Sequence, residues 1–399
     1  MSVVESVVFF YFLGSVLYVL VFSLAGKFAR EKRIPSTEKY SKIALLVPAY
    51  KEDQIILSIV EYLLKQDYPS EYYDVIIIAD SFQRETIHKL SQYPIQVLEV
   101  DFDKSTKAKS LNHALQHLPS IYDIAIVSDA DNVPESQFLT KINDAYQFGY
   151  PVVQGRRIAK NQDTPFALLD TASEIINNHI FRKGFNATGL SSSLIGSGMA
   201  FPFKELKDKM ANIHAVGGFD RELQLAFIKE NNSIHYLDNA IVFDEKIESP
   251  QAFENQRRRW ISSQFIYLKK YFWGGIKQLL KGNVSYFNIA VLYNLFLPRL
   301  LNLGALLILS VIATVAAAKL TIPYYYWWLL LLTYGIALLI AIPAKFFNRD
   351  LVKAISKLPQ AFVIMFRSLL RMKGADKKFI HTVHTKTEID NTIFYQKQK

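Results

Sequence analysis

Two aspartates, Asp129 and Asp131, stand one residue apart directly after the short apolar run 123–127. Carboxylates at this spacing can share one hard cation with a diphosphate, because Mg²⁺ usually takes one or two protein carboxylates and fills its shell with water and phosphate oxygens. The competing interpretation is that both are turn residues that cap a helix beginning near Pro134. Their position after a strand-like run favours the metal, and two carboxylates alone do not distinguish Mg²⁺ from Mn²⁺.

Other polar groups also follow strand-like runs. Asp80 follows the run 74–79, where it could accept a hydrogen bond from a nucleobase or cap a helix over residues 83–90. Lys107 lies in the first turn of a helix-like stretch, where it could neutralise phosphate or remain solvated on the surface. The first strand-like run is followed by a polar, turn-forming segment with the residues Pro48, Ala49, Tyr50 and Glu52.

These groups need a sheet that brings the ends of its strands together. Four β-rich runs, at 43–47, 74–79, 95–100 and 123–127, alternate with helix-like stretches such as 107–118. This alternation predicts βαβ units and a Rossmann-like α/β fold with a mostly parallel sheet that is buried on both faces. Ligands bind beyond the carboxyl ends of the strands in such sheets, so we expect the polar clusters to converge there.

Composition limits the class of protein. The chain has 399 residues, of which 50% are hydrophobic and 14% aromatic, so membrane segments are expected. The absence of cysteine excludes a disulfide scaffold and thiolate metal sites. The net charge of +10 could attract nucleic acid, but the basic residues flank apolar runs, which favours anionic lipid headgroups and argues against nucleic acid.

The N-terminal segment 1–26 predicts a transmembrane anchor. Residues 3–25 are apolar apart from Glu5 and a few small polar residues, which is long enough to cross a hydrocarbon core of about 30 Å. No basic segment precedes the run, and it is too long for the apolar part of a signal peptide. Basic residues follow at once, so the positive-inside rule places the next domain, residues 27–262, in the cytoplasm.

Residues 263–399 predict a C-terminal membrane region. Two uncharged runs within 300–344 predict a transmembrane hairpin. Basic segments stand on both sides of this region, so the number of spans between them should be even. The uncharged stretch 284–298 is therefore expected to lie at the membrane interface, as part of an interfacial region 263–298.

The segment 351–373 mixes large apolar residues with lysine and arginine, which predicts a second helix along the membrane surface. The alternative is a third C-terminal span broken by Pro359 and Arg367. The tail 379–399 carries no pattern from which a structure can be predicted.

Taken in order, these motifs resemble the GT-A fold of the family 2 glycosyltransferases, specifically the membrane group that contains cellulose, chitin and hyaluronan synthases and ceramide glucosyltransferase. The resemblance covers nearly the whole chain. Its most specific motif is Q-R-R-R-W at 256–260, which matches Q-x-x-R-W through Gln256, Arg259 and Trp260. The other matching segments are the opening loop 47–52, the acidic residue Asp80, the lysine motif 107–112, the Asp-x-Asp pair 129–131 and the acceptor loop 196–201.

The resemblance implies a role for each matching residue. A nucleotide-sugar donor, with UDP as the expected nucleotide, would be bound by Pro48, Ala49, Tyr50, Glu52, Asp80, Lys107 and Asp129. Mg²⁺ or Mn²⁺ would be bound by Asp129 and Asp131. The protein would be an integral protein of the cell (inner) membrane with its catalytic domain in the cytoplasm.

The chain departs from the family pattern at the catalytic base. The family carries a Thr-Glu-Asp motif followed by Leu-Glu-Leu, whereas this chain has D-R-E-L-Q-L at 220–225. Aligning the Leu-x-Leu puts Glu222 in the place of the base, with Asp220 close enough to compete, and we expect Glu222. The lysine motif also has Thr106 where the family has glycine.

The implied reaction is inversion by a single displacement. Glu222 would take a proton from the acceptor hydroxyl, and the leaving diphosphate would be stabilised by the metal and by Arg259. Trp260 would offer an aromatic face to a sugar ring. The competing interpretation of this segment is an interfacial helix with Trp at headgroup depth and arginines on lipid phosphates.

Three functions remain open from the sequence. The first, which is the function that we expect, is a polysaccharide synthase at the cytoplasmic membrane face. Three spans are few for a polymer channel, so export would call for a homo-oligomer or a partner. The second is a single transfer to a lipid acceptor such as a sphingolipid or polyprenyl phosphate. The third is a catalytically silent nucleotide-binding scaffold, against which the retained carboxylates argue.

Overall fold

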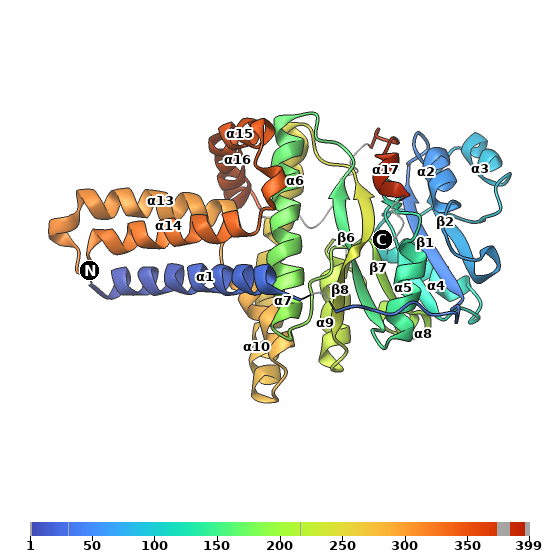
Figure 1. Ribbon diagram of the computed structural model, residues 1–399, viewed down its shortest axis with the longest axis horizontal. Helices are drawn as coiled ribbons and strands as arrows, with labels where there is room; N and C mark the ends of the chain where they lie inside the picture. The colour runs from blue at the N-terminus through green and yellow to red at the C-terminus, as the bar shows by residue number, and fades with distance from the viewer. Residues whose placement is uncertain (1, 31, 216, 373–383, 396–399) are drawn as a thin grey trace. The chain divides into compact units, whose positions relative to one another are not determined.

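The computed structural model describes residues 2–30, 32–215, 217–372 and 384–395, and its contacts divide the chain into two units (Figure 1). The sheet unit comprises residues 31–162, 191–246 and 376–399, and the helical unit comprises residues 1–30, 163–190 and 247–375. Neither unit is one continuous stretch. This division differs from the predicted domain limits, because residues 163–190 join the helices and the C-terminal tail joins the sheet.

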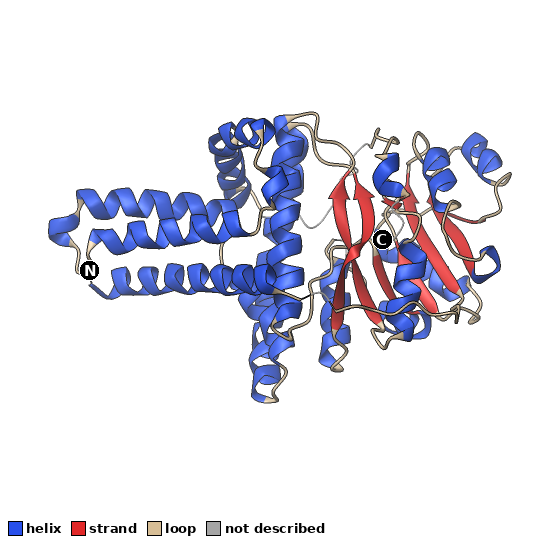
Figure 2. Cartoon of the chain, in the orientation of Figure 1, coloured by secondary structure: helices blue, strands red, loops and turns tan. Residues whose placement is uncertain are grey.

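The sheet unit is built on a mixed sheet with the strand order β3-β2-β1-β4-β7-β6-β8-β5 (Figure 2). The strands are β1 (Ile43–Tyr50), β2 (Tyr73–Asp80), β3 (Gln96–Val100), β4 (Ile124–Val127), β5 (Val133–Pro134), β6 (Val152–Ala159), β7 (Met199–Pro202) and β8 (Ile234–Asp244). All four strands predicted from the sequence are present. The Rossmann-like α/β class is therefore confirmed.

The strand pairing creates a switch point in the sheet. β1 pairs in parallel with β2 on one side and with β4 on the other, and β3 continues beyond β2. β7 then pairs antiparallel with both β4 and β6, while β6 and β8 are parallel. The carboxyl ends of β1 and β4 therefore face the crevice where such sheets bind ligands.

Helices cover the sheet (Figure 1). Ile56, Val60 and Leu63 recur at helical spacing on α2 and are fully buried in the same core as the strands β1 and β2. Phe394, near the end of the chain, is buried in this core as well. The helices of this unit are α2 (Ile56–Leu63), α3 (Arg84–Leu90), α4 (Lys107–His117), α5 (Phe138–Gln147), α8 (Phe203–Met210), α9 (Phe219–Lys229) and α17 (Asn391–Phe394), with a 3₁₀ turn at Ser70–Tyr72.

Three apolar helices lie side by side in the helical unit: α1 (Ser2–Phe28), α13 (Arg299–Val315) and α14 (Tyr324–Ile340) (Figure 1). The Ser23 hydroxyl donates to the Ala337 carbonyl at 2.6 Å, and Glu5 accepts from the backbone N–H of Thr321 and Ile322 in the loop between α13 and α14. The predicted helix 3–25 and the predicted hairpin are thus present as helices that pack together.

Among the described helices, α1 alone is long and apolar enough to cross a membrane as one straight helix. Its 27 residues extend about 40 Å. α13 and α14 have 17 residues each, or about 25 Å, which is shorter than a typical hydrocarbon core. Membrane crossing by these two helices therefore stays a prediction.

The stretch predicted to be interfacial forms a broken helix. Its parts are α11 (Val284–Phe287), a π-helical turn (Asn288–Leu292) and α12 (Tyr293–Leu295), and it meets α13 at a 52° bend. The bend falls at Pro298, which cannot continue the backbone ladder. Together with α13 this segment could form one broken span or a re-entrant loop.

The helical unit also contains shorter helices and one long helix, α10. They are α6 (Pro165–Asn177), a π-helical turn (Asn178–Gly184), α7 (Phe185–Ala187), α10 (Pro250–Leu280), α15 (Arg349–Ser356) and α16 (Leu358–Leu370), with 3₁₀ turns at Ala317–Lys319 and Ala344–Phe346. α1 approaches the π turn very closely, because a Cβ on Gly184 would lie 2.2 Å from the Phe22 carbonyl oxygen. Only glycine fits at this crossing.

Candidate active site

The Asp-x-Asp pair stands at the switch point, directly after β4. Asp131 is 5% exposed, and its Oδ2 accepts a hydrogen bond from Asn132 Nδ2 at 3.0 Å. Lys107 Nζ forms an ion pair with Asp129. The next helix, α5, begins at Phe138 without a side-chain cap, so neither aspartate is a helix cap. The helix-capping alternative from the sequence is therefore excluded, although the pair does lie in a turn, which the Asn132 N–H closes by donating to the Asp129 carbonyl at 3.0 Å.

The charge balance of this pair suits a divalent cation. Burial raises the pKa of Asp129, Lys107 opposes this rise, and the negative charge of Asp131 adds to it. Two neighbouring carboxylates of this kind are stabilised by a cation between them. Within the described ranges no cluster of three His, Cys, Asp or Glu residues could hold a metal alone. A cation here would take its other ligands from phosphate and water, as Mg²⁺ commonly does.

A hydrogen-bonded clamp holds this pair against the loop before β7. Ser197 Oγ accepts from the Asp129 N–H at 2.9 Å and donates to Asn132 Oδ1 at 2.5 Å. Gln154, on β6, donates to the Ser197 carbonyl at 2.9 Å and accepts from the Ile195 N–H at 3.1 Å. Sequence reasoning missed these clamp residues, because single Ser, Asn and Gln residues carry no motif.

Asp80 is the last residue of β2, and only one of its two carboxylate oxygens accepts hydrogen bonds from the protein. Ser81 Oγ and Ser105 Oγ donate to Oδ1 at 2.9 and 3.0 Å, while the buried Oδ2 has no hydrogen-bond partner. Burial raises the pKa of this carboxyl. The helix α3 has Gln83 at its cap position, so Asp80 is not a cap. A ligand N–H donor at Oδ2 would complete its hydrogen bonding.

The predicted nucleotide loop lies beside Asp80. Pro48, Ala49 and Tyr50 belong to β1 and pair with Ile78, Ala79 and Asp80 of β2. Lys51 and Ser81 follow the two strand ends with φ of 56° and 59°, a conformation that is uncommon for residues other than glycine. Such backbone outliers concentrate at ligand sites.

Lys107 and Asp220 lie beside the same glycine. Lys107 Nζ donates to the Gly196 carbonyl at 2.6 Å, and a Cβ on Gly196 would lie 3.9 Å from Asp220 Oδ2. The Lys107 ammonium also lies 5.4 Å from the Phe219 ring centroid. The surface alternative for Lys107 is thus excluded, since it contacts Asp129 and the acceptor loop.

Asp220 and Glu222 occupy different faces of α9. Residues two apart on a helix are about 200° apart, so only one of them can face Gly196. Asp220 shares its face with the buried residues Leu223 and Phe227. Burial raises the pKa of Asp220, opposed by Arg221 and Lys107. The structure therefore brings Asp220 to Lys107 and the acceptor loop.

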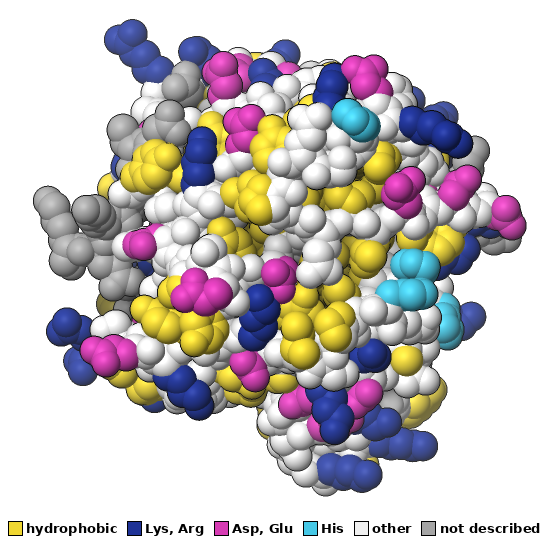
Figure 3. Space-filling view, turned by 90° about the vertical axis from the view of Figure 1, so that its right-hand side faces the viewer, with side chains coloured by type: hydrophobic (Ala, Val, Ile, Leu, Met, Phe, Trp, Pro, Cys, Tyr) yellow, Lys and Arg dark blue, Asp and Glu magenta, His cyan; other side chains and the backbone are white. Residues whose placement is uncertain are grey.

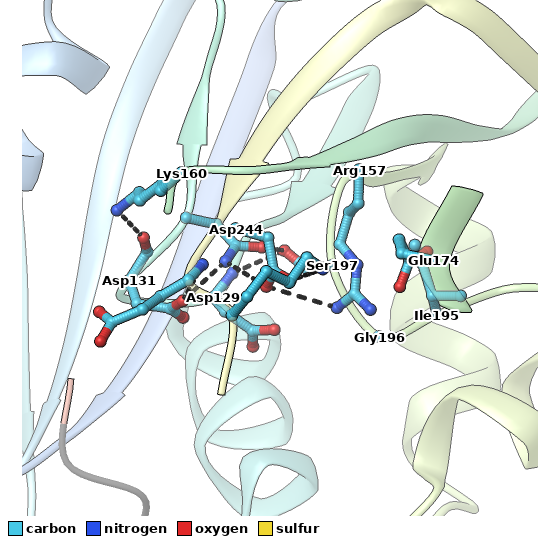
Figure 4. Close-up of polar contacts among 12 residues, drawn as sticks. Asp129, Asp131, Arg157, Lys160, Glu174, Ile195, Gly196, Ser197 and Asp244 are labelled. Atoms are coloured by element: carbon cyan, nitrogen blue, oxygen red, sulfur yellow. Dashed lines mark hydrogen bonds and ion pairs between the residues drawn. The ribbon is translucent and has the colours of Figure 1, made fainter. Parts of the chain in front are cut away.

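A second layer of charges lies on the β6 and β8 side of Asp131 (Figure 4). Lys160 donates to the Asp131 backbone carbonyl, and Asp244 forms ion pairs with Lys246 at 2.5 Å and Arg157 at 3.6 Å. Burial lowers the pKa of Lys160, while Asp131 and nearby carboxylates oppose this effect. The strands β6 and β8 thus supply both signs of charge to the site.

The C-terminal tail also reaches the site. His384 Nδ1 lies 2.9 Å from Glu52 Oε1, and Glu52 is 7% exposed. Burial by itself lowers the pKa of His384, but Asp131, Glu52 and Glu245 outweigh burial and raise the pKa to about 10. His384 was not predicted, because it is 332 positions from Glu52 in the chain.

Gln256, Arg259 and Trp260 belong to the helical unit, on α10, and not to the sheet unit that holds the carboxylates. The Arg257 guanidinium lies 4.4 Å from the Trp260 ring and forms a 2.5 Å ion pair with Asp170. Burial lowers the pKa of Arg259. Trp260 is 40% exposed, so part of its ring remains open to a ligand.

The surface offers no strong electrostatic pattern on the face in Figure 3. Basic and acidic side chains of the described residues are interspersed there with apolar ones. A single-sign stripe, as in many nucleic-acid-binding proteins, is therefore not seen on that face.

Comparison with known families agrees with the site. Residues 41–263 match the model described as glycosyltransferase like family 2, which is more than half of the chain. The chain belongs to glycosyltransferase family 2. The predicted enzyme class, a glycosyltransferase, is therefore confirmed.

Two other proteins resemble the chain more distantly. A β-monoglucosyldiacylglycerol synthase of Synechocystis sp. is 27% identical over 239 residues, which cover 56% of this chain and 48% of that protein. The chain thus matches about half the length of this curated relative. A mannosyltransferase of Pyrobaculum calidifontis, solved with GDP-Man and Mn²⁺, shares the fold with a TM-score of 0.57 at 13% identity, covering 92% of this chain and 99% of that one.

Proposed function

We propose that this protein is an inverting, metal-dependent glycosyltransferase that moves one sugar from a nucleotide-sugar donor to the hydroxyl of a membrane lipid. The observation that carries the proposal is the meeting of Asp129, Asp131, Lys107 and Asp220 at the switch point of the sheet. This set contains two carboxylates for a metal, a cation for phosphate and a half-buried carboxylate for proton removal.

The donor would bind along the ends of β1, β2 and β4. The unpartnered Asp80 Oδ2 would accept a hydrogen bond from a nucleobase N–H, and Lys107 would neutralise diphosphate charge. Uracil and guanine both carry a suitable N–H, so Asp80 is compatible with either base. UDP remains our expected nucleotide because of the family resemblance.

Asp220 would act as the general base. It would take the proton of the acceptor hydroxyl as that oxygen attacks the anomeric carbon, and burial, which raises its pKa, strengthens it as a base. This assignment replaces the sequence-based preference for Glu222, which lies about 200° away on α9. The displacement would invert the anomeric configuration.

The residues present fit a divalent cation. Asp129 and Asp131 would hold Mg²⁺ or Mn²⁺, which would supply positive charge to the leaving diphosphate. Asn132 and the Asp129 N–H, both bonded to Ser197, would keep the two carboxylates oriented. Lys107 would remain beside Asp129 to face the phosphates.

A lipid acceptor is favoured over a polysaccharide. The relative from Synechocystis is named for a glucosylated diacylglycerol, and a β-glucoside is the product that inversion gives from an α-linked nucleotide sugar. The helical unit carries exposed apolar side chains on the three apolar helices α1, α13 and α14, which suits a lipid environment. These side chains include Phe10, Leu17 and Val21 on α1, Ile308, Val311 and Val315 on α13, and Leu329, Leu332 and Leu339 on α14.

Packing in the helical unit also favours a product that stays at the membrane. The apolar helices α1, α13 and α14 each carry fully buried side chains. These are Ser15, Ser23, Ser310, Tyr334 and Ala337, each at most 1% exposed. A growing polymer would need an open path through such a bundle. We therefore propose that the enzyme acts at the cytoplasmic membrane face, with α1 as its anchor.

The test is nucleoside diphosphate release by the full-length protein in lipid nanodiscs. A panel of nucleotide sugars is supplied with diacylglycerol or another lipid that carries a hydroxyl group. Each reaction contains Mn²⁺, Mg²⁺ or EDTA, and the products are identified by mass spectrometry. We expect metal-dependent transfer of one sugar to the lipid with one donor, abolished in Asp131→Asn but kept in the exposed control Asp208→Asn. Long glycan products would instead support the polysaccharide alternative, and full activity in EDTA would contradict metal dependence.

A further inference from the structure

The end of the chain is anchored in the core of the sheet unit. Phe394 on α17 is fully buried, and its ring lies 5.3 Å from that of Tyr62 on α2 in a T-shaped contact. The Phe394 carbonyl accepts a hydrogen bond from the Ser136 N–H at 3.1 Å. Ile389 and Ile393 pack against the same core cluster. These contacts make the segment 384–394 a fixed part of this unit.

The other end of the segment ties together three groups at strand ends. His384 Nδ1 bonds Glu52 after β1, at 2.9 Å. The N–H groups of Thr385 and Lys386 donate to the Glu245 carboxylate after β8, at 3.0 to 3.2 Å.

The third tie joins the Lys386 carbonyl to Lys160 after β6. Lys160 Nζ donates to that carbonyl at 3.2 Å. The segment therefore contacts the ends of β1, β6 and β8 at once.

Two of these groups also hold Asp131. Lys160 Nζ donates to the Asp131 carbonyl, and the Glu245 N–H donates to Asp131 Oδ2 at 3.4 Å. The segment is thus linked to the metal-binding aspartate through both Lys160 and Glu245. Glu52 and Asp131 are both buried, so a change in the tail would remove the His384 hydrogen bond to a buried carboxylate and alter the groups around Asp131.

We propose that residues 384–394 form a wall of the donor diphosphate site, in which His384 is a positioning residue that fixes Glu52 and, with the tail backbone, the surroundings of Asp131. This inference rests on the proposed function, because it assumes that a metal-bound nucleoside diphosphate occupies the site. The alternative is a strap that blocks the diphosphate and must leave. The buried Phe394 argues for the wall, since departure would expose a core side chain.

The experiment measures binding rather than turnover. Full-length protein in nanodiscs is titrated with UDP, and in parallel with GDP, in the presence of Mn²⁺, and bound Mn²⁺ is followed by electron paramagnetic resonance. The variants are His384→Ala, His384→Gln and Phe394→Ala. The matched controls are His88→Ala, an exposed histidine on α3, and Tyr395→Ala, the exposed neighbour of Phe394. Melting temperatures are recorded for all proteins.

We expect His384→Ala and Phe394→Ala to weaken nucleoside diphosphate binding by about ten-fold or more, because a hydrogen bond to a buried carboxylate is lost or displaced. His384→Gln, which keeps an N–H donor, should recover part of this loss, and both controls should match the wild type. His384→Ala should keep the wild-type melting temperature. Hydrogen exchange of a peptide covering 384–395 should slow on addition of UDP and Mn²⁺.

Unchanged binding in both His384→Ala and Phe394→Ala would overturn the proposal, and tighter binding would show that the segment is a blocking strap. A wild-type protein that binds neither nucleotide with Mn²⁺ would instead contradict the proposed function. The two negative results are distinguishable. Failure of the wall proposal appears as equal nucleotide affinity in the variants and the wild type, whereas failure of the proposed function appears as no nucleotide binding by the wild type.

Discussion

The choice between Asp220 and Glu222 as the base leads to a sharp prediction. Asp220→Asn removes the negative charge while keeping the size and the hydrogen-bonding capacity of the side chain. Glu222→Gln makes the same change two residues further along α9. Because the two side chains are about 200° apart around the helix, the variants should differ strongly.

The expected magnitude follows from the role of the carboxylate. General base catalysis typically contributes about 10²–10⁴ in rate, which corresponds to about 3–5 kcal/mol of transition-state stabilisation. The burial that raises the pKa of Asp220 makes this carboxylate a stronger base, so we expect a loss near the middle of that range, about 10³-fold. Glu222→Gln should retain activity within about three-fold, as expected for a side chain outside the proton transfer.

The assay separates chemistry from binding. Single-turnover release of nucleoside diphosphate at saturating donor reports the chemical step, and titration with UDP and Mn²⁺ reports the donor site. Asp220→Asn should lower the rate with little change in nucleotide affinity, since a base acts on the acceptor. A similar loss in both variants, or a loss in Glu222→Gln alone, would refute the assignment of Asp220.

Three further outcomes are expected. Asp80→Asn should weaken UDP binding about ten-fold, because an amide replaces the unpartnered oxygen with a donor, while the exposed Asp103→Asn should not; isothermal titration measures both. Gly184→Ala should lower the melting temperature by several degrees, since its Cβ would lie 2.2 Å from a backbone oxygen, whereas Gly335→Ala, with nothing within 4 Å, should not. Burial lowers the pKa of His235 to about 4, so between pH 6.5 and 4 the unfolded state binds more protons than the folded state. The free energy of unfolding should therefore decrease by about 1–2 kcal/mol, after solvent screening, as the pH is lowered from 6.5 to 4. His235→Phe should remove this contribution in urea titrations.

The strands β1 and β4 at the switch point could be predicted from the sequence, because the side chains of residues 43–47 and 124–127 are packed in the core. Residues 43–47 and 124–127 are fully buried, which requires uninterrupted apolar, β-branched sequence. β6 was not predicted, since it reads V-V-Q-G-R-R-I-A, in which Gln154, Arg156 and Arg157 interrupt the apolar pattern. Those polar residues are present because β6 forms one side of the site. The residues that build a site therefore weaken the pattern that would reveal the strand.

The proposed catalytic base shows a different limit of prediction from sequence. Alignment of Leu-x-Leu pointed to Glu222, whereas helical periodicity groups Asp220 with Leu223 and Phe227 on the buried face. Both patterns are visible in the sequence, and only the second reflects which side of the helix meets the sheet. The proposed role of Asp220 thus rests on the helix face that it shares with the core, whereas the prediction of Glu222 rests on a short motif.

Each unit is built from several separate segments of the chain, and local sequence patterns could not predict this. Burying a phenylalanine contributes about 2–3 kcal/mol, so the anchor at Phe394 is a sizeable part of the stability of a domain whose net stability is about 5–15 kcal/mol. A contiguous fragment 27–262 would lack this anchor and His384. It would also carry α6 and the following π turn without α1, against which that turn packs in the close Gly184 contact. The pairing of Phe394 with Tyr62 depends on the completed fold, because neither residue has a sequence neighbour that specifies the other. The core of the sheet unit is therefore completed by residues that follow the apolar helices in the chain.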